Sequence, residues 1–131
     1  MRQLKEPVLW TNLLFVVNAA LWALVGFPYT SVLVLLTAAA SYIYHLLHER
    51  NRLAHIVDMA FAYTALVWTS IVVVDFLTGV HLFALAICLF FGLVFKRLAH
   101  LKTYESYHTY WHWCVFFGQA LLALSTTTFL S

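Results

Sequence analysis

The hydrophobic positions of the chain fall into five long runs, separated by short polar or turn-forming segments. A helix needs about 20 apolar residues to cross the roughly 30 Å hydrocarbon core of a membrane, and the five runs meet that requirement. The expected membrane helices cover residues 8–27, 29–48, 54–76, 80–97 and 104–130. We therefore expect an all-α fold: a single transmembrane domain over residues 1–131, built as a bundle of about five helices.

The composition also indicates that the chain lies in lipid rather than in water. Hydrophobic residues make up 64% of the chain and charged residues 9%, whereas an ordinary soluble domain carries roughly 25% charged residues. So few charges cannot cover a surface exposed to water, which makes lipid the natural solvent. The first run is longer than the 7–15 apolar residues typical of a signal peptide, which favours a retained first helix.

The basic residues predict the orientation in the membrane. All seven Lys and Arg residues fall on one side of a five-helix arrangement: Arg2, Lys5, Arg50, Arg52, Lys96, Arg97 and Lys102. By the positive-inside rule that side, with the N-terminus, is cytoplasmic. We expect a multi-pass integral membrane protein, in the inner membrane if the chain is bacterial. The net charge of +2 does not indicate nucleic-acid binding, because these residues serve as topological signals first and as contacts to anionic lipids second.

Several polar residues fall inside the expected membrane helices, close to their cytoplasmic ends. An ionisable residue within the membrane is costly to bury unless it finds a partner, so it marks a candidate functional site. Residues four apart share a helix face, and at 1.5 Å per residue these groups occupy one layer on the order of 5–12 Å below the interface. They are Ser41 and His45, Asp58, and His108 and His112. His81 enters from the opposite side, about 20 Å away, and is excluded from this site.

These residue types predict a metal site. His108 and His112, at i and i+4, can bind one metal ion from a single helix, and His45 completes a set of three imidazoles. Zn²⁺ suits such a set, although another divalent ion remains open. Three protein ligands leave a fourth position for a water whose pKa falls toward about 7. Asp58 can then accept or orient the proton of that water, and Ser41 can hydrogen-bond the water, the carboxylate or a developing oxyanion.

Other polar and aromatic residues have simpler interpretations. Three histidines near the basic edge are expected to make interhelical hydrogen bonds or to lie at the interface: His48, His55 and His100. Whether His48 or His55 joins the metal site stays open. Tryptophans near the cytoplasmic edge are expected to be interface anchors: Trp10, Trp111 and Trp113. Asn18 is a buried polar residue of the first helix whose partner the sequence does not name.

The ordered set of motifs resembles the CREST superfamily of membrane hydrolases and receptors, which includes alkaline ceramidases, progestin and adiponectin receptors and haemolysin-III-like proteins. Its pattern is SxxxH near the end of one helix, Asp near the start of the next, and HxxxH near the start of the last. Here these are S-Y-I-Y-H from Ser41 to His45, H-I-V-D ending at Asp58, and H-T-Y-W-H from His108 to His112. The resemblance implies that the three histidines bind zinc and that Asp58 and Ser41 assist catalysis. The family usually has seven spans, so the chain corresponds to a shortened form, in which a partner subunit of a homo-oligomer could close the lipid cavity.

Three functions are compatible with this pattern. The favoured one is a ceramidase-like, intramembrane zinc hydrolase, whose metal-bound water attacks the carbonyl of a lipid or another amphipathic amide or ester that enters from the bilayer. The second is a receptor-like or structural protein whose zinc fastens helices together. The third is a haem-b electron carrier, although the i, i+4 histidine pair fits zinc better than haem. The sequence does not reveal the substrate, the oligomeric state or the membrane.

Overall fold

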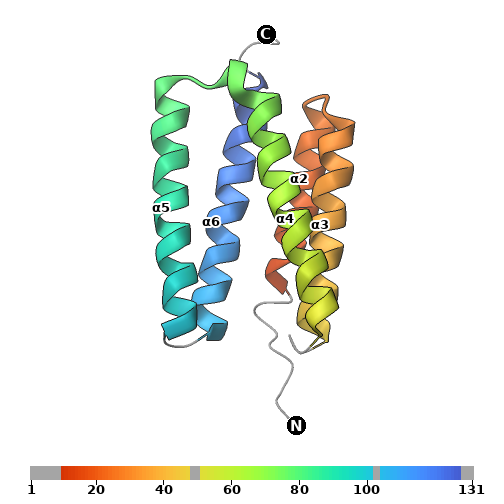
Figure 1. Cartoon of the computed structure of the whole chain (residues 1–131). Coiled ribbons are helices and arrows are strands. Elements are labelled where there is room, and N and C mark those ends of the chain that lie inside the picture. Colours follow the sequence, from red (N-terminus) through yellow and green to blue (C-terminus); the bar gives the residue numbers. More distant parts are fainter. Residues whose placement is uncertain (1–9, 48–50, 102–103, 128–131) are drawn as a thin grey trace.

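The structure is a computed structural model, and it describes residues 10–47, 51–101 and 104–127, without the side chains of Tyr104 and Glu105. Within these ranges the chain forms an all-α bundle. Its elements are α2 (Leu13–Leu24), α3 (Pro28–Leu46), α4 (Arg52–Val73), the short 3₁₀ helix η1 (Val74–Phe76), α5 (Gly79–Leu101) and α6 (Tyr104–Ser125). The helices run alternately up and down, so that α2, α4 and α6 point the same way (Figure 1). The expected all-α fold is confirmed.

Within the part of the chain that the structure describes, three helices are long and apolar enough to cross a membrane: α3, α4 continued through η1, and α5. They indicate a membrane protein. Helix α2 is apolar but shorter, with 12 residues. Many large hydrophobic side chains point outward from the bundle, among them Leu24, Val80 and Phe83, which are 82%, 77% and 69% exposed. Such a surface suits a lipid solvent, because lipid tails are as apolar as these side chains.

The first helix ends earlier than expected, at Leu24 rather than at residue 27. The reason is Gly26, whose φ of +89° lies in the left-handed region that favours glycine. Its N–H bonds to the carbonyl of Ala23, and the N–H of Phe27 bonds to that of Trp22, which together form a Schellman motif. The ring of Phe27 packs edge-on against Trp22 at 5.7 Å. Pro28 then opens α3, since its fixed φ suits the first turn of a helix.

Local interactions also determine where the other helices begin and end. Helix α4 begins at Arg52 because the side chain of Asn51 accepts a hydrogen bond from the N–H of Ala54, at 3.0 Å. The expectation that the fourth helix stops at residue 97 is wrong, because α5 continues to Leu101. Lys and Arg are good helix formers, and positive charge is favourable in the last turns of a helix. The last helix ends at Ser125, earlier than the expected residue 130. The first residues of the 8–27 run, and residues 128–130, lie outside the described residues.

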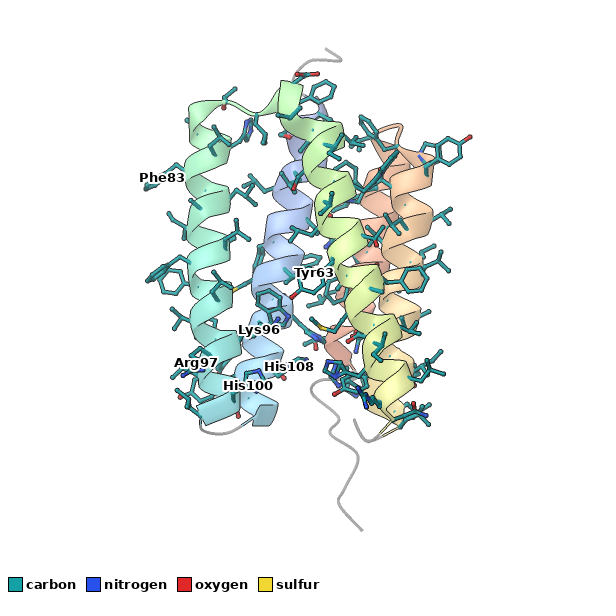
Figure 2. All side chains as sticks on the ribbon, in the orientation of Figure 1. Tyr63, Phe83, Lys96, Arg97, His100 and His108 are labelled. Atoms are coloured by element: carbon teal, nitrogen blue, oxygen red, sulfur yellow. The ribbon has the colours of Figure 1, made fainter. Side chains whose placement is uncertain are left out.

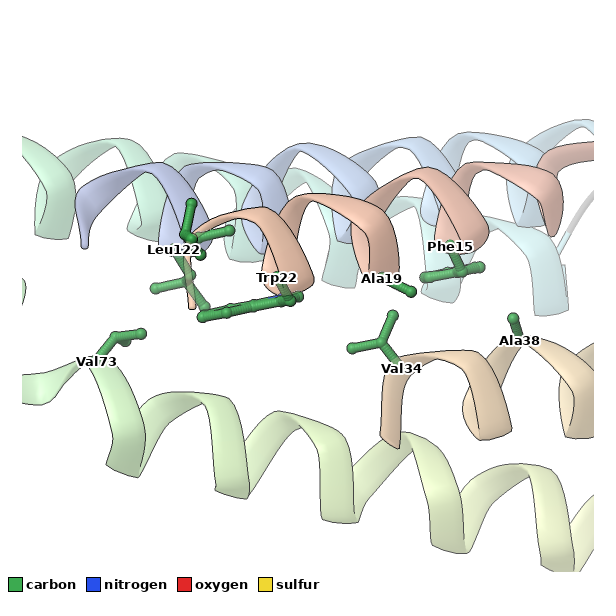
Figure 3. Close-up of a cluster of buried hydrophobic side chains, with 9 residues drawn as sticks. Phe15, Ala19, Trp22, Val34, Ala38, Val73 and Leu122 are labelled. Carbon is green, nitrogen blue, oxygen red and sulfur yellow. The ribbon is translucent and has the colours of Figure 1, made fainter. Parts of the chain in front are cut away.

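Helix α6 is the contact centre of the bundle: it packs most extensively on α5 and also touches α2 and α4, while α3 lies between α2 and α4. The core of buried side chains gathers where α2 faces α3, α4 and α6 (Figure 3). Its members are Phe15, Ala19, Trp22, Val25, Val34, Ala38, Val73, Leu122 and Ala123. This packing fixes the ends of α3 and α6 that carry the histidines.

Candidate metal centre

Three histidines from two helices come together at one end of the bundle. His45 lies in the last turn of α3, and His108 and His112 lie on one face of α6. Each offers one ring nitrogen, and these three atoms all lie within 4.8 Å of one another. His45 and His112 are buried and His108 is half-buried. The group can hold a metal ion.

The closest pair fits a shared ion well. The Nε2 atoms of His45 and His108 are 3.2 Å apart. Two nitrogens at 2.0–2.1 Å from a tetrahedral zinc ion are separated by roughly 3.3 Å, which is nearly the same distance. The ring centroids are 4.7 Å apart for His108 and His112, and 5.6 Å apart for His45 and His112. A small movement of rings therefore suffices for three nitrogens to share one ion.

Thr11, which precedes α2, orients His112. Its Oγ1 lies 2.9 Å from Nδ1 of His112, and both residues are buried. When Nδ1 carries the ring hydrogen and donates it to Thr11, the lone pair of Nε2 is directed toward the other imidazoles. Histidines that bind metals usually make such a bond with their second nitrogen, which fixes the tautomer and the ring orientation. The ring of Phe15 also packs edge-on against His112, at 5.5 Å.

Sequence reasoning missed Thr11, because the matched motifs cover only the second to last helices. A signal was present. Thr11, Asn18 and Trp22 are spaced seven and four residues apart, so they share one face of the first helix.

Ser41 and Asp58 lie beside the histidines. The Ser41 hydroxyl donates a hydrogen bond to the Asp58 carboxylate, and that carboxylate interacts electrostatically with His45 and His55. Ser41 is buried one turn before His45 on α3, and Asp58 is half-buried on α4. The structure thus brings together all five residues that the sequence singled out, from α3, α4 and α6.

The other described histidines do not belong to the cluster of three. His55 is exposed, and the hydroxyl of Tyr44 lies 3.1 Å from its Nδ1, with the two rings in edge contact. His81 lies at the opposite end of the bundle, where its Nδ1 accepts a hydrogen bond from the backbone N–H of Thr78 at the start of α5. His100 is exposed near the end of α5. His48 lies outside the described residues.

A second polar layer lies deeper in the bundle and joins α2, α4 and α6. Trp22 donates its indole N–H to Oε1 of Gln119, at 3.0 Å, and Gln119 donates from Nε2 to Oγ1 of Thr69, at 3.2 Å. Asn18 donates from Nδ2 to the backbone carbonyl of Phe116, at 3.2 Å. The partner that the sequence could not name for Asn18 is therefore a backbone oxygen, one turn beyond His112.

Comparison of the chain with protein-family models, with curated proteins and with solved structures finds no match.

Proposed function

We propose that this protein is an intramembrane zinc-dependent hydrolase that acts on a lipid or another amphipathic amide or ester. The observation that carries the proposal is the cluster of His45, His108 and His112 on α3 and α6, whose ligand atoms lie within 4.8 Å of one another. Histidines are expensive inside a membrane, so three that converge need a common purpose.

The donor set fits zinc better than other common ions. Imidazole nitrogens suit Zn²⁺, whereas Mg²⁺ and Ca²⁺ prefer oxygen ligands. A zinc ion held by three imidazoles keeps a fourth position open, lowers the pKa of a water there to about 7 and polarises a carbonyl oxygen. Thr11, bonded to His112, supports this assignment because it leaves Nε2 available as the ligand.

Asp58 and Ser41 supply the proton transfer and the orientation. Asp58 accepts a proton from the attacking water at its carboxylate and delivers it to the leaving nitrogen or oxygen. The hydrogen bond from Ser41 holds that carboxylate in place beside the histidines. In the reacting complex the same hydroxyl can donate to the oxygen on which negative charge develops.

In this proposal α2 and α6 also cross the membrane, which gives five spans. The basic residues then lie on the cytoplasmic side, and the histidine cluster lies just beneath that surface. The substrate reaches it from within the bilayer, and its scissile bond lies at the depth where the acyl chain meets the headgroup.

One observation favours a second function, in which the metal is structural. Helices α3 and α6 are not among the helix pairs that pack extensively, yet His45 of α3 meets two histidines of α6. A metal ion bound by these histidines would hold α3 and α6 together. Such a site would retain its metal but need neither Asp58 nor an open fourth position.

The experiment that tests the proposal combines metal content with turnover. Purified wild type is expected to contain about one zinc per chain by elemental analysis, and His108→Ala is expected to lose it. Asp58→Asn should keep the zinc and lose the hydrolysis of an acyl amide. If the protein binds zinc but no hydrolysis depends on Asp58, the structural function is favoured. If the wild type binds no metal, both the hydrolase and the structural function are contradicted.

A further inference from the structure

Two neighbouring basic residues of α5 have different surroundings. Gly92 and Ala99 are the buried residues of this helix. Lys96 follows Gly92 by four residues and precedes Ala99 by three, so it shares their inward face. Lys96 is half-buried, whereas Arg97 is exposed. A basic residue that only sets the orientation in the membrane has no need to face the interior of the bundle. Arg97 faces outward in this way, whereas Lys96 does not.

Trp111 of α6 positions the Lys96 side chain. The Nζ atom of Lys96 lies over the indole ring of Trp111, 5.3 Å from its centroid, which is a cation–π contact. The ring in turn lies against α5 at Gly92, where an added Cβ would approach Cζ3 to 2.9 Å. Because Trp111 directly precedes His112, this stack of Gly92, Trp111 and Lys96 is tied to the helix that carries two of the histidines.

Lys96 also lies near the candidate site. Its charge attracts the Asp58 carboxylate of α4 only weakly, less than His45 and His55 do. Helix α5 packs mainly on α6, and α4 packs mainly on α3, so little packing joins α4 to α5. Lys96 and His108 lie toward the same end of the bundle (Figure 2). A cation therefore lies toward the end of the bundle that holds the histidine cluster, on a helix that packs little on α4.

We propose that Lys96 binds the anionic headgroup of the lipid substrate, so that the protein prefers acyl amides or esters bearing a carboxylate or phosphate over neutral ones. This inference rests on the proposed hydrolase function. The ammonium group of a lysine sits on a flexible side chain, so it can reach an anionic headgroup at variable depth in the membrane. Its attraction for that anion is stronger where water is partly excluded than in bulk water. Lys96 then acts as a specificity-determining residue that makes no bond to the scissile group.

The test uses two amides with the same acyl chain. The full-length protein in phosphatidylcholine vesicles is given N-palmitoylglycine, which is anionic, or N-palmitoylethanolamine, which is neutral. Wild type is expected to favour the anionic amide in kcat/KM by about fivefold, the effect of one cation near an anionic group. Lys96→Gln should remove the preference through KM, while Lys96→Arg and the matched control Arg97→Gln keep it. An unchanged preference in Lys96→Gln would overturn the role of Lys96 but leave the hydrolase intact.

Binding separates this inference from the proposed function. The affinities of both amides for wild type and for Lys96→Gln are measured by titration calorimetry. If neither amide is hydrolysed but Lys96→Gln binds only the anionic one about fivefold more weakly, the anion site stands without the enzyme. Equal affinities in both proteins would refute it. If phosphatidylglycerol added to the vesicles abolishes the preference, the site is one for bulk anionic lipid and the substrate assignment is wrong.

Discussion

Oγ1 of Thr11 lies 2.9 Å from Nδ1 of His112, and this contact joins the start of the first described helix to the histidine cluster in the last. Thr11 and His112 are 101 positions apart in the chain. The contact forms because α2 and α6 run in the same direction and pack together. The start of α2, with Thr11 just before it and Phe15 in its first turn against His112, thus borders the candidate site, although it provides none of the three clustered histidines.

Replacing Thr11 by Val should weaken metal binding, because His112 loses the oxygen that fixes its tautomer. Loss of such a supporting hydrogen bond typically costs about 10–100-fold in metal affinity. The measurement is a zinc titration against a competing chelator. Thr11→Ser keeps the oxygen and should bind zinc like wild type. The matched control is Thr64→Val, since Thr64 is exposed and bonds only within α4, to the carbonyl of Ala60. Wild-type affinity in Thr11→Val would argue against Nε2 as the ligand atom of His112.

Substitution of His45 and His55 should have opposite outcomes, although both interact with Asp58. His45 belongs to the histidine cluster, whereas His55 is exposed and meets Tyr44. His45→Ala is expected to abolish stoichiometric zinc in elemental analysis, and His55→Ala to retain it. If zinc is lost from His55→Ala while the protein stays folded, the ligand set of the metal centre is wrong.

The sequence predicted the helical fold and the gathering of the five site residues for one physical reason. Ionisable groups in apolar helices must face each other rather than lipid, so spacing along each helix and depth in the membrane define where they meet. Ser41, His45 and Asp58 could be placed in this way because each lies a known number of turns from a helix end.

Contacts between helices were harder to predict. Neither the bond from Thr11 to His112 nor that from Trp22 to Gln119 follows from spacing within one helix, because each depends on which helices are neighbours. Likewise, the contacts of the half-buried Trp111 with Gly92 and Lys96 depend on α5 being the neighbour of α6. The end of α5 was also misplaced, since charge marks the membrane boundary and not the end of a helix.

The polar layer around Gln119 should stabilise the bundle. Gln119→Leu leaves the indole N–H of Trp22 without its acceptor and removes the donor to Thr69. Interhelical hydrogen bonds in membranes contribute about 0.6–2 kcal/mol each, so we expect a loss of roughly 1–3 kcal/mol in the free energy of unfolding. The measurement is a denaturant unfolding curve in mixed micelles. Thr127→Ala is the control, because Thr127 is exposed just after α6 and its hydroxyl donates to the carbonyl of Leu124, three residues earlier. Equal stability of Gln119→Leu and wild type would show that the layer contributes nothing measurable.

Two glycines at the contact of α5 with α6 should respond differently to the same change. At Gly92 an added Cβ would lie 2.9 Å from Cζ3 of Trp111, so the ring must move, whereas at Gly118 the nearest atom, Cδ1 of Leu85, is at 3.7 Å, an ordinary contact. Alanine is favoured over glycine in a helix by up to about 1 kcal/mol, so Gly118→Ala should be neutral or stabilising. Gly92→Ala should lower the unfolding midpoint, because overpacking costs about 1–3 kcal/mol, and should shift the tryptophan fluorescence as Trp111 is displaced. Identical midpoints and spectra in the two variants would mean that α5 and α6 do not approach each other at Gly92 as the structure has them.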